Sequence, residues 1–381
     1  MNSVPKKIRV AVVFGGRSAE HEVSLQSARY VVASLDRTRY EPVLIGIDRA
    51  GRWFLNDGSL MLIDEDDTRS IRMQNGSTEV ALTANGARRA IVPVGRADAR
   101  VGAAPADGSD GIGPIDVIFP VLHGPYGEDG TIQGLAKLAD LPCIGAGVLG
   151  SAVGMDKDVM KRLLRDAGIP IARFVAFTER DRDRFGFDAV AELFGSPVYV
   201  KPANLGSSVG VARAATAVEY DSALRDAFEY DTKVIVEECV HGREIEVAVL
   251  GNDDPRASVP GEIVPKDGFY SYDAKYIDAD GAALMIPADL PPDAVARLQE
   301  LAIHTFRVVE CSGMARVDFF LRPDGEIVVN EINTIPGFTR ISMYPKLWEA
   351  SGVSGGELVA TLIELAREKY ARESALKTEP R

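Results

Sequence analysis

The feature that most limits what this chain can fold into is a hairpin signal in its C-terminal quarter. Asp324-Gly325 stands between two runs of alternating apolar residues, a pattern that predicts a two-residue loop joining two antiparallel strands. With that loop as the turn, Asp318 faces Glu331 and Arg316 faces Asn333. Residues two apart on a strand share a face, so these four polar side chains are expected to lie together, with facing Cβ atoms about 5 Å apart.

The polar group on this hairpin predicts a metal site. Two facing carboxylates repel each other unless a cation lies between them. Oxygen ligands from Asp318, Glu331 and Asn333 suit Mg2+, which completes its shell with water and nucleotide phosphates. Arg316 offers a fork for a carboxylate or a developing oxyanion. The alternative is a solvent-exposed strand pair with ordinary charges, but the aromatic and aliphatic neighbours favour an enclosed face. A bulged turn would shift the register by one residue.

A second signal is the glycine-rich segment 201–210, with the sequence Lys-Pro-Ala-Asn-Leu-Gly-Ser-Ser-Val-Gly, between two predicted strands. Its small residues, Ser207 and Ser208 among them, allow several backbone N–H groups to point at one anion such as a triphosphate. The segment is not a Walker loop, because no Gly-Lys-Ser/Thr ends it and no helix follows directly. An ordinary glycine hairpin is the alternative.

Charged residues elsewhere add to a nucleotide site. Lys157 opens a predicted helix, Lys201 ends a strand and Lys275 lies in an aromatic stretch. Three lysines can thus reach phosphates from different sides, although any single lysine is more often simply solvated. Glu237 and Glu244 flank a predicted bend between strands, which can present backbone and carboxylate groups to an adenine and a ribose.

Two turns near the N-terminus predict a small-molecule site. Residues 15–21 and 123–130 each end a strand and open a helix, which places them at the carboxyl edge of a sheet, where open α/β domains bind ligands. Glu20 offers an anionic partner for an ammonium group, and the alternative is a first-turn glutamate favoured by the helix dipole. For His21 and His123 a structural role is equally open, and neither is assigned as a base.

The order of predicted elements indicates an α/β protein of several domains. A chain of 381 residues exceeds one ordinary core, and about 150 residues per domain suggests two or three, of which we expect three. Strand 8–14, a helix over 20–35 and strand 115–122 predict an open α/β domain, with hairpins and a surface loop of no assigned chemistry over 56–113. The remainder reads as α+β. We place the domains at 1–147, 148–238 and 239–381.

Composition excludes several classes of partner. With 43 Lys and Arg against 56 Asp and Glu, the net charge of -13 repels nucleic acid and anionic membrane surfaces. Cys143, Cys239 and Cys311 lack CxxC spacing, which argues against a disulfide framework or zinc site and fits a reducing cytosol. No run of about 18 apolar residues predicts a membrane span. We therefore expect a cytoplasmic protein that binds neither nucleic acid nor membrane.

Taken together, the motifs resemble those of the D-alanine–D-alanine ligases of the ATP-grasp superfamily. The resemblance covers nearly the whole chain. Each motif alone is moderately specific, and in this order they are highly specific; they are residues 15–25, 123–134, 201–210, 269–276 and 330–345.

The resemblance implies an open α/β N-terminal domain followed by a two-domain ATP-grasp module, with ATP between the central and C-terminal domains and D-alanine where all three meet. It implies nucleotide contacts by Lys157, Lys201, Ser207, Ser208, Glu237, Val240, Glu244 and Lys275. Two Mg2+ ions, with Mn2+ as a substitute, are implied at Asp318, Glu331 and Asn333.

For the amino-acid substrates, the resemblance implies one set of residues for each molecule. Glu20 would bind the ammonium of the first D-alanine, and Arg316 with the Gly337 backbone would hold its reacting carboxylate. The carboxylate of the second D-alanine would lie against Lys275 and Ser342. A hydrogen-bonded set that orders a lid would consist of Glu20, Ser207 and Tyr276.

The implied reaction transfers the γ-phosphoryl group of ATP to the first D-alanine. The second amine then attacks the acyl phosphate through a tetrahedral intermediate, which Arg316 and the Gly337 amide would stabilise. The product, D-alanyl-D-alanine, is a peptidoglycan precursor, and a homodimer is expected. Ser271 departs from the acidic residue frequent in the family, and the loop over 102–113 is longer than expected, but neither touches an implied ligand.

Three other functions fit parts of the sequence. A D-alanine–D-lactate ligase would typically have another residue in place of Tyr276, so Tyr276 favours the dipeptide. A non-catalytic nucleotide-binding regulator would be expected to lack a metal ligand or a lid lysine. An ATP-grasp carboxylase would usually have a carrier-domain partner, to which nothing in this chain points.

Overall fold

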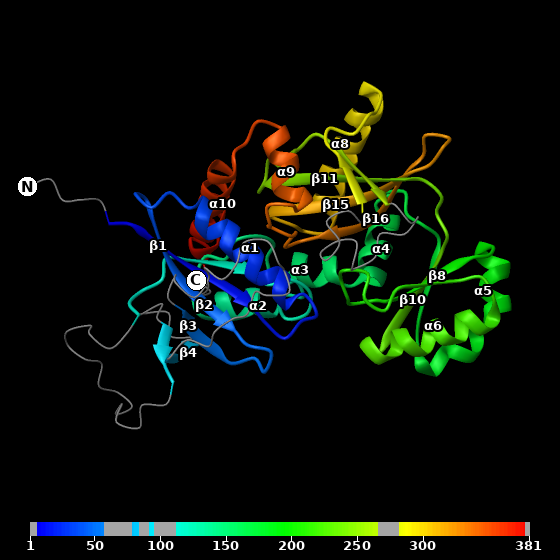
Figure 1. Ribbon diagram of the computed structural model, residues 1–381, viewed down its shortest axis with the longest axis horizontal. Helices are drawn as coiled ribbons and strands as arrows, with labels where there is room; N and C mark the ends of the chain where they lie inside the picture. Colours follow the sequence, from blue (N-terminus) through cyan, green and yellow to red (C-terminus); the bar gives the residue numbers. More distant parts are fainter. Residues whose placement is uncertain (1–5, 57–77, 84–90, 95–111, 266–281, 378–381) are drawn as a thin grey trace, which may run out of the picture.

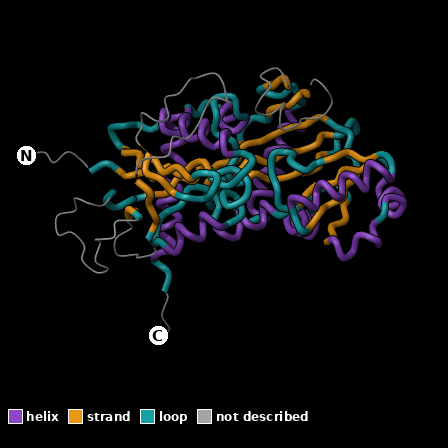
Figure 2. Tube along the Cα trace, turned by 60° about the horizontal axis from the view of Figure 1, so that its bottom comes forward, coloured by secondary structure: helices purple, strands orange, loops and turns teal. Residues whose placement is uncertain are grey.

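The computed structural model describes residues 6–56, 78–83, 91–94, 112–265 and 282–377 (Figure 1). Three β-sheets organise these residues, and helices pack against the faces of the sheets (Figure 2). The strand and helix pattern confirms the α/β class. None of the helices in the described part of the chain has the length and apolar composition of a membrane span.

The N-terminal sheet has the strand order β5-β4-β3-β2-β1-β6. Its three parallel strands are β1 (Ile8–Gly15), β2 (Tyr40–Ile47) and β6 (Val117–Val121). An antiparallel extension consists of β3 (Trp53–Asn56), β4 (Thr78–Leu82) and β5 (Ile91–Pro93). This confirms the open α/β domain and the strands of the expected hairpins, whereas most of the remaining segment 56–113 lies outside the described residues.

Alternate residues of β1 enter different cores, as expected for a sheet covered on both faces. Val10, Val12 and Phe14 pack with α1 (His21–Ser34), whereas Ala11 and Val13 share a core with α2 (Thr131–Leu138). Because β1 and β6 are parallel, the turns that follow them lie at the same carboxyl edge of the sheet, as predicted.

The central sheet is antiparallel, in the order β7-β10-β8-β9. Its strands are β7 (Phe174–Thr178), β8 (Val198–Pro202), β9 (Ala212–Ala214) and β10 (Lys233–Glu238). One face packs against the 3-10 helix η2 (Glu179–Phe185), α5 (Phe187–Phe194) and α6 (Ala217–Tyr230). Because side chains alternate along a strand, the valines of β8 and β10 enter that core while Lys201 and Glu237 face the other way.

The C-terminal sheet runs β14-β13-β11-β15-β16, with β12 beside β11. Its strands are β11 (Arg243–Gly251), β12 (Arg256–Ala257), β13 (Gly261–Pro265), β14 (Ala282–Met285), β15 (Gly313–Leu321) and β16 (Ile327–Asn333). One face shares a core with α3 (Val148–Met155), α4 (Lys157–Asp166) and α8 (Pro292–Val308). The other shares a core with α9 (Met343–Ala350) and α10 (Gly355–Ser374).

The predicted hairpin is present, but the prediction of a two-residue loop was wrong. Arg322 N donates to Glu326 O, so the loop has three residues and ends at Gly325, whose φ of +87° suits glycine. This loop alone would shift the pairing by one residue. A bulge at Asn330 shifts it back, so that Asp318 faces Glu331 and Arg316 faces Asn333, as predicted.

Helix α10 lies beside α1, far from α10 in sequence (Figure 1). Its fully buried Leu358, Val359, Leu362 and Ile363 belong to the same core as α1 and β1. The last helix of the chain therefore completes the N-terminal core. The domain limits 1–147, 148–238 and 239–381 stay a prediction.

Candidate active site

Two adjoining cavities lie where the three sheets meet. The first, of about 440 Å3, lies between the β15–β16 hairpin and the face of the central sheet that carries Lys201 and Glu237. The second, of about 60 Å3, lies between the two N-terminal turns, the hairpin and the segment after β16. Gly206 and Glu331 line both. A molecule in one cavity therefore lies next to a molecule in the other.

The first cavity brings together most of the residues expected at a nucleotide site. Its predicted lining residues are Lys157, Lys201, Ser208, Glu237, Val240, Glu244 and Glu331. Lys275, which was expected there, lies outside the described residues. Ser207 lines the second cavity instead. Sequence reasoning missed the aromatic lining, formed by Tyr199 and Phe320, and the basic Arg213.

A buried row of charges stands behind the first cavity. Glu237 is only 3% exposed, and its carboxylate lies between Lys201 Nζ, 2.6 Å from Oε2, and Lys161 Nζ, 2.9 Å from Oε1. Burial opposes the charged form, but the two ammonium groups outweigh it and lower the pKa of Glu237 to about 2. Glu237 is therefore an anion between two cations.

The glycine-rich loop forms the wall between the cavities. Ser207 and Ser208 both have positive φ, 53° and 58°, an uncommon backbone conformation for residues with a side chain. Lys157 secures the loop, since its backbone N donates to Ala203 O and its Nζ donates to Leu205 O at 2.7 Å. Lys157 Nζ also lies 3.4 Å from Glu331 Oε2.

The second cavity joins segments that are distant in sequence. The Ser207 hydroxyl donates a hydrogen bond to the Glu20 carboxylate, which links the central loop to the start of α1. Glu20 is 6% exposed and lines the cavity with Arg316, Gly337 and Ser342, as predicted. Tyr276, the third expected member of the Glu20 set, lies outside the described residues. The cavity therefore offers an anionic side and a cationic side.

Gly337 lies where the segment after β16 bends closely around Ser342. A Cβ at this position would lie 2.9 Å from Ser342 Oγ. The Ser342 hydroxyl in turn accepts a hydrogen bond from Thr339 N at 3.0 Å. This close approach explains a glycine at position 337, where the backbone is expected to face a substrate carboxylate.

The segment that carries Gly337 is held from the N-terminal domain. His123 Nδ1 lies 3.0 Å from Ile335 O, and Ile335 N donates to Glu128 Oε1. His123 Nε2 pairs with Ser27, whose hydroxyl accepts from Phe338 N. Burial lowers the pKa of His123, which keeps the ring neutral with Nδ1 as the donor. His21 Nδ1 meets Gly16 O, so the structural role left open for both histidines is the one that the hydrogen bonds support.

The predicted metal ligands are adjacent on β15 and β16. Asn333 Nδ2 lies 3.0 Å from Asp318 Oδ2, and Glu331 faces Asp318. Arg316 holds the Asp318 carboxylate with Nε and Nη2, at 2.7 and 2.8 Å, so Asp318 lines neither cavity directly. Among the described residues, no group of three or more His, Cys, Asp and Glu side chains is placed to hold a metal ion. The oxygen donors fit Mg2+ only together with the Asn333 amide and phosphates.

Glu246 completes this polar row and was missed from the sequence. It faces Asp318 across β11 and β15, is 6% exposed, and its Oε2 lies 2.9 Å from Arg316 Nε. The spacing of two from Glu244 on one strand was the available signal. Lys161 on α4 was also missed. It follows Lys157 by four residues, and this helical spacing, which places both lysines on one side of the helix, was the available signal.

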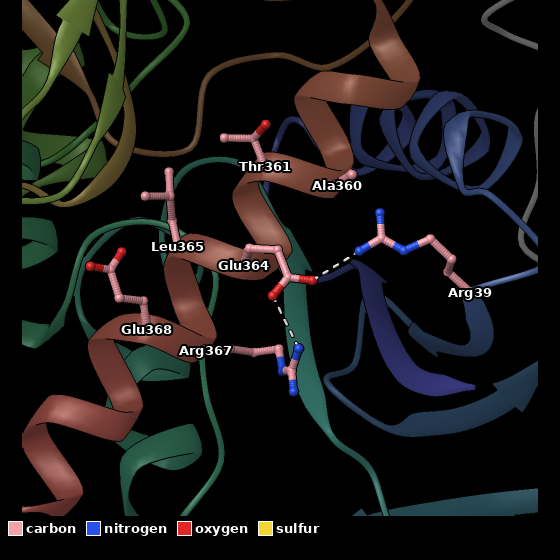
Figure 3. A pocket seen from close by; sticks show the side chains of 7 residues that line it. All are labelled: Arg39, Ala360, Thr361, Glu364, Leu365, Arg367 and Glu368. Carbon is pink, nitrogen blue, oxygen red and sulfur yellow. Dashed lines mark hydrogen bonds and ion pairs between the residues drawn. The ribbon is translucent and has the colours of Figure 1, made fainter. Parts of the chain in front are cut away.

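Another hollow, of about 630 Å3, lies along α10 (Figure 3). Its charged residues pair with each other, since Glu364 contacts Arg39 at 3.2 Å and Arg367 at 3.0 Å. These side chains are about half exposed, so water competes for each charge. The hollow lacks the convergent buried groups of the two cavities between the sheets.

Comparisons with known proteins agree with this site. A family model described as D-ala D-ala ligase N-terminus matches residues 9–146, and one described as D-ala D-ala ligase C-terminus matches residues 163–364. A D-alanine–D-alanine ligase from Shouchella clausii is 51% identical over 372 residues, which are 98% of this chain and 98% of the relative. D-alanine–D-alanine ligase A from Chromobacterium violaceum is 52% identical over 373 residues, covering 97% and 98%.

Solved structures give the same result. The D-alanine-D-alanine ligase from Coxiella burnetii superposes with a TM-score of 0.82 at 38% identity, covering 97% of this chain and 96% of the other. The VanG D-Ala:D-Ser ligase from Enterococcus faecalis gives a TM-score of 0.81 at 36% identity, covering 95% and 100%. The likeness thus extends over all three sheets.

Proposed function

The chain belongs to the D-alanine–D-alanine ligase family of ATP-grasp enzymes, and on that basis we propose how its two cavities join two D-alanine molecules with ATP. The product is D-alanyl-D-alanine for peptidoglycan synthesis. The observation that carries the proposal is the wall of Gly206 and Glu331 shared by the two cavities. It brings a terminal phosphate in the first cavity next to a carboxylate in the second, and phosphoryl transfer depends chiefly on such positioning.

In this proposal the first cavity holds ATP. Lys157 and Lys201 bind the phosphates, helped by the backbone N–H groups around Ser208 and by Lys275. Glu237, Val240 and Glu244, at the bend after β10, hold the adenosine. The side chains of Tyr199 and Phe320 supply the apolar area that an adenine ring requires.

The second cavity holds the amino acids. Glu20 binds the ammonium of the first D-alanine, and Ser207 fixes the Glu20 carboxylate. Tyr276 is the third member that we propose for this set. Arg316 and the Gly337 N–H hold the reacting carboxyl group and later the tetrahedral oxyanion, for which one donor typically contributes about 3 kcal/mol. Ser342 and Lys275 hold the carboxylate of the second D-alanine.

Asp318, Glu331 and Asn333 are the residues that would hold two Mg2+ ions, or Mn2+ in their place. When bound, these ions neutralise charge on the phosphates. The support is the donor chemistry, because two carboxylates and an amide face each other across the hairpin. A cation at Asp318 competes with Arg316 for that carboxylate, and Glu246 also holds the guanidinium.

A homodimer and a cytoplasmic location complete the proposal. Leu138 on α2 and Val148 and Leu149 on α3 are 70%, 41% and 60% exposed, and the two helices are neighbours. Such an apolar patch favours association of two copies. Analytical ultracentrifugation of wild type and of Leu149→Glu tests this association. ATP and the free thiols of Cys143, Cys239 and Cys311 fit the cytoplasm.

The decisive experiment supplies ATP and Mg2+ with single amino or hydroxy acids and measures phosphate release. D-alanine alone is expected to support turnover, with D-alanyl-D-alanine identified by mass spectrometry, whereas L-alanine gives none. A mixture of D-alanine with D-lactate or D-serine tests the second site. Preferential formation of the mixed product would replace the dipeptide assignment, and no phosphate release with any of these acids would refute the ligase assignment.

A further inference from the structure

Lys161 is a fully buried lysine that lines neither cavity. It lies on α4, one helical turn after Lys157, and its Nζ approaches Glu237 Oε1 at 2.9 Å. The Phe174 ring lies 6.0 Å from the same ammonium. Lys and Glu side chains are almost never fully buried unless paired, so the pair needs an explanation beyond solubility or surface charge.

The second oxygen of Glu237 is held by a lysine that does reach the first cavity. Lys201 Nζ lies 2.6 Å from Glu237 Oε2 and 3.4 Å from Asn330 Oδ1. Lys161, Glu237 and Lys201 thus form a row that runs from the core to the cavity. Burial lowers the pKa of Lys161, and the adjacent Glu237 carboxylate counteracts that shift. With both lysines protonated, the row carries one negative and two positive charges, so one positive charge is in excess.

This row limits what Lys201 can do when an anion enters. To bind a phosphate, the Lys201 ammonium must turn at least partly away from Glu237. A buried carboxylate that loses its only counter-ion is strongly destabilised. Without a second cation, Glu237 would therefore retain Lys201.

We propose that Lys161 is a positioning residue, a fixed counter-ion of Glu237 that releases Lys201 to bind the phosphates of ATP. The inference deepens the nucleotide-binding role proposed above for the first cavity and rests on it. Lys161 acts through Glu237 and does not touch the nucleotide. Because Lys161 is out of reach of the cavity, it stays on Glu237 in both states, whereas Lys201 exchanges one anion for another.

The test compares the binding of ATP and adenosine by calorimetry in wild type and Lys161→Met. ATP without added metal is the probe, so that metal binding does not enter. We expect Lys161→Met to weaken ATP binding by about 10-fold or more and adenosine binding by less than about 2-fold, because only ATP requires Lys201. Lys161→Arg should recover most of the affinity. Arg162→Met is the matched control, since Arg162 is an exposed neighbour on the same helix and should change neither affinity.

A second variant pair keeps the test independent of folding. In Glu237→Gln the carboxylate that retains Lys201 is gone, so adding Lys161→Met should change ATP affinity by less than about 2-fold. Equal weakening of ATP and adenosine binding by Lys161→Met, or no weakening of either, would overturn the inference. So would a further loss of ATP affinity when Lys161→Met is added to Glu237→Gln. Wild-type protein that binds no ATP even when Mg2+ is added would instead refute the proposed function of the cavity.

Discussion

Glu331 is the residue at which the two cavities meet. It faces Asp318, lies 3.4 Å from Lys157 Nζ and lines both cavities. A carboxylate in this place can balance the lysine charge and bind a cation beside the phosphates. Its neighbour Asn330 reaches the first cavity as well, because the bulge turns two consecutive side chains toward it.

Replacing Glu331 by glutamine should therefore abolish turnover without unfolding the protein. We expect kcat to fall by about 100-fold or more, since the charge is lost where phosphoryl transfer is proposed. Phosphate release measures the loss, and circular dichroism checks the fold. Glu326→Gln, at an exposed position near the loop of the same hairpin, should retain activity. Full activity of Glu331→Gln would contradict the role given to this carboxylate.

Glu237 predicts a pH effect on stability. Its pKa is lowered to about 2 from a value of 4.5, so the folded state binds fewer protons than the unfolded state between these values. The ion pairs therefore stabilise the fold fully above pH 4.5 and lose their effect as the pH falls toward 2. The free energy of unfolding of wild type should exceed that of Glu237→Gln most above about pH 5. A difference that is constant from pH 6 to pH 3 would refute this.

At the scale of the element, the β15–β16 hairpin shows what periodicity predicts and what it does not. Alternation along the strands was enough to predict that Arg316, Asp318, Glu331 and Asn333 share one face. It could not predict a three-residue loop, because Asp324-Gly325 suits either loop length. The bulge at Asn330 has no clear pattern in a single sequence, and it restores the predicted pairing only because its one-residue shift opposes that of the loop.

The end of α8 permits a prediction about a single helix. Glu310 follows the helix with a φ of +56°, and Cys311 N donates to Phe306 O, which is the hydrogen bond of a left-handed helix end. Glycine adopts this conformation without the cost of a Cβ. We expect Glu310→Gly to stabilise the protein by about 1 kcal/mol, measured by urea unfolding, with activity unchanged.

Glu310→Ala is the control for this change. Alanine removes the carboxylate but keeps the Cβ, so its stability should stay within about 0.5 kcal/mol of wild type. If alanine and glycine stabilise the protein equally, the backbone conformation is not the cause.

At the scale of the whole molecule, the three sheets do not correspond to three separate cores. One core contains residues of β1, α1, β11, α9 and α10, so the first and last parts of the chain are packed together. The sequence predicted the open α/β domain, because alternating strands and helices are local patterns. It could not predict that α10 completes the N-terminal core, since an apolar helix face does not say which sheet it covers.

Removing residues 355–381, which contain α10, should therefore unfold the N-terminal sheet. The deletion exposes apolar surface of α1 and β1 that α10 covers, including the contacts of the fully buried Leu358 and Leu362. Limited proteolysis should show cleavage within residues 8–47 of the truncated protein. Truncation after Ser374 is the control and should leave these residues protected. Protection in both truncated proteins would show that the N-terminal sheet is stable without α10.

The thin partition of Gly206 and Glu331 has a consequence for inhibitor design. A single compound that joins an adenosine-like part to an amino-acid-like part through a short spacer could occupy both compartments at once. Tethering makes the second contact intramolecular, so such a compound should bind far more tightly than either half. Its selectivity would come from the spacer, which must fit between a glycine without a side chain and an acid that repels unscreened negative charge.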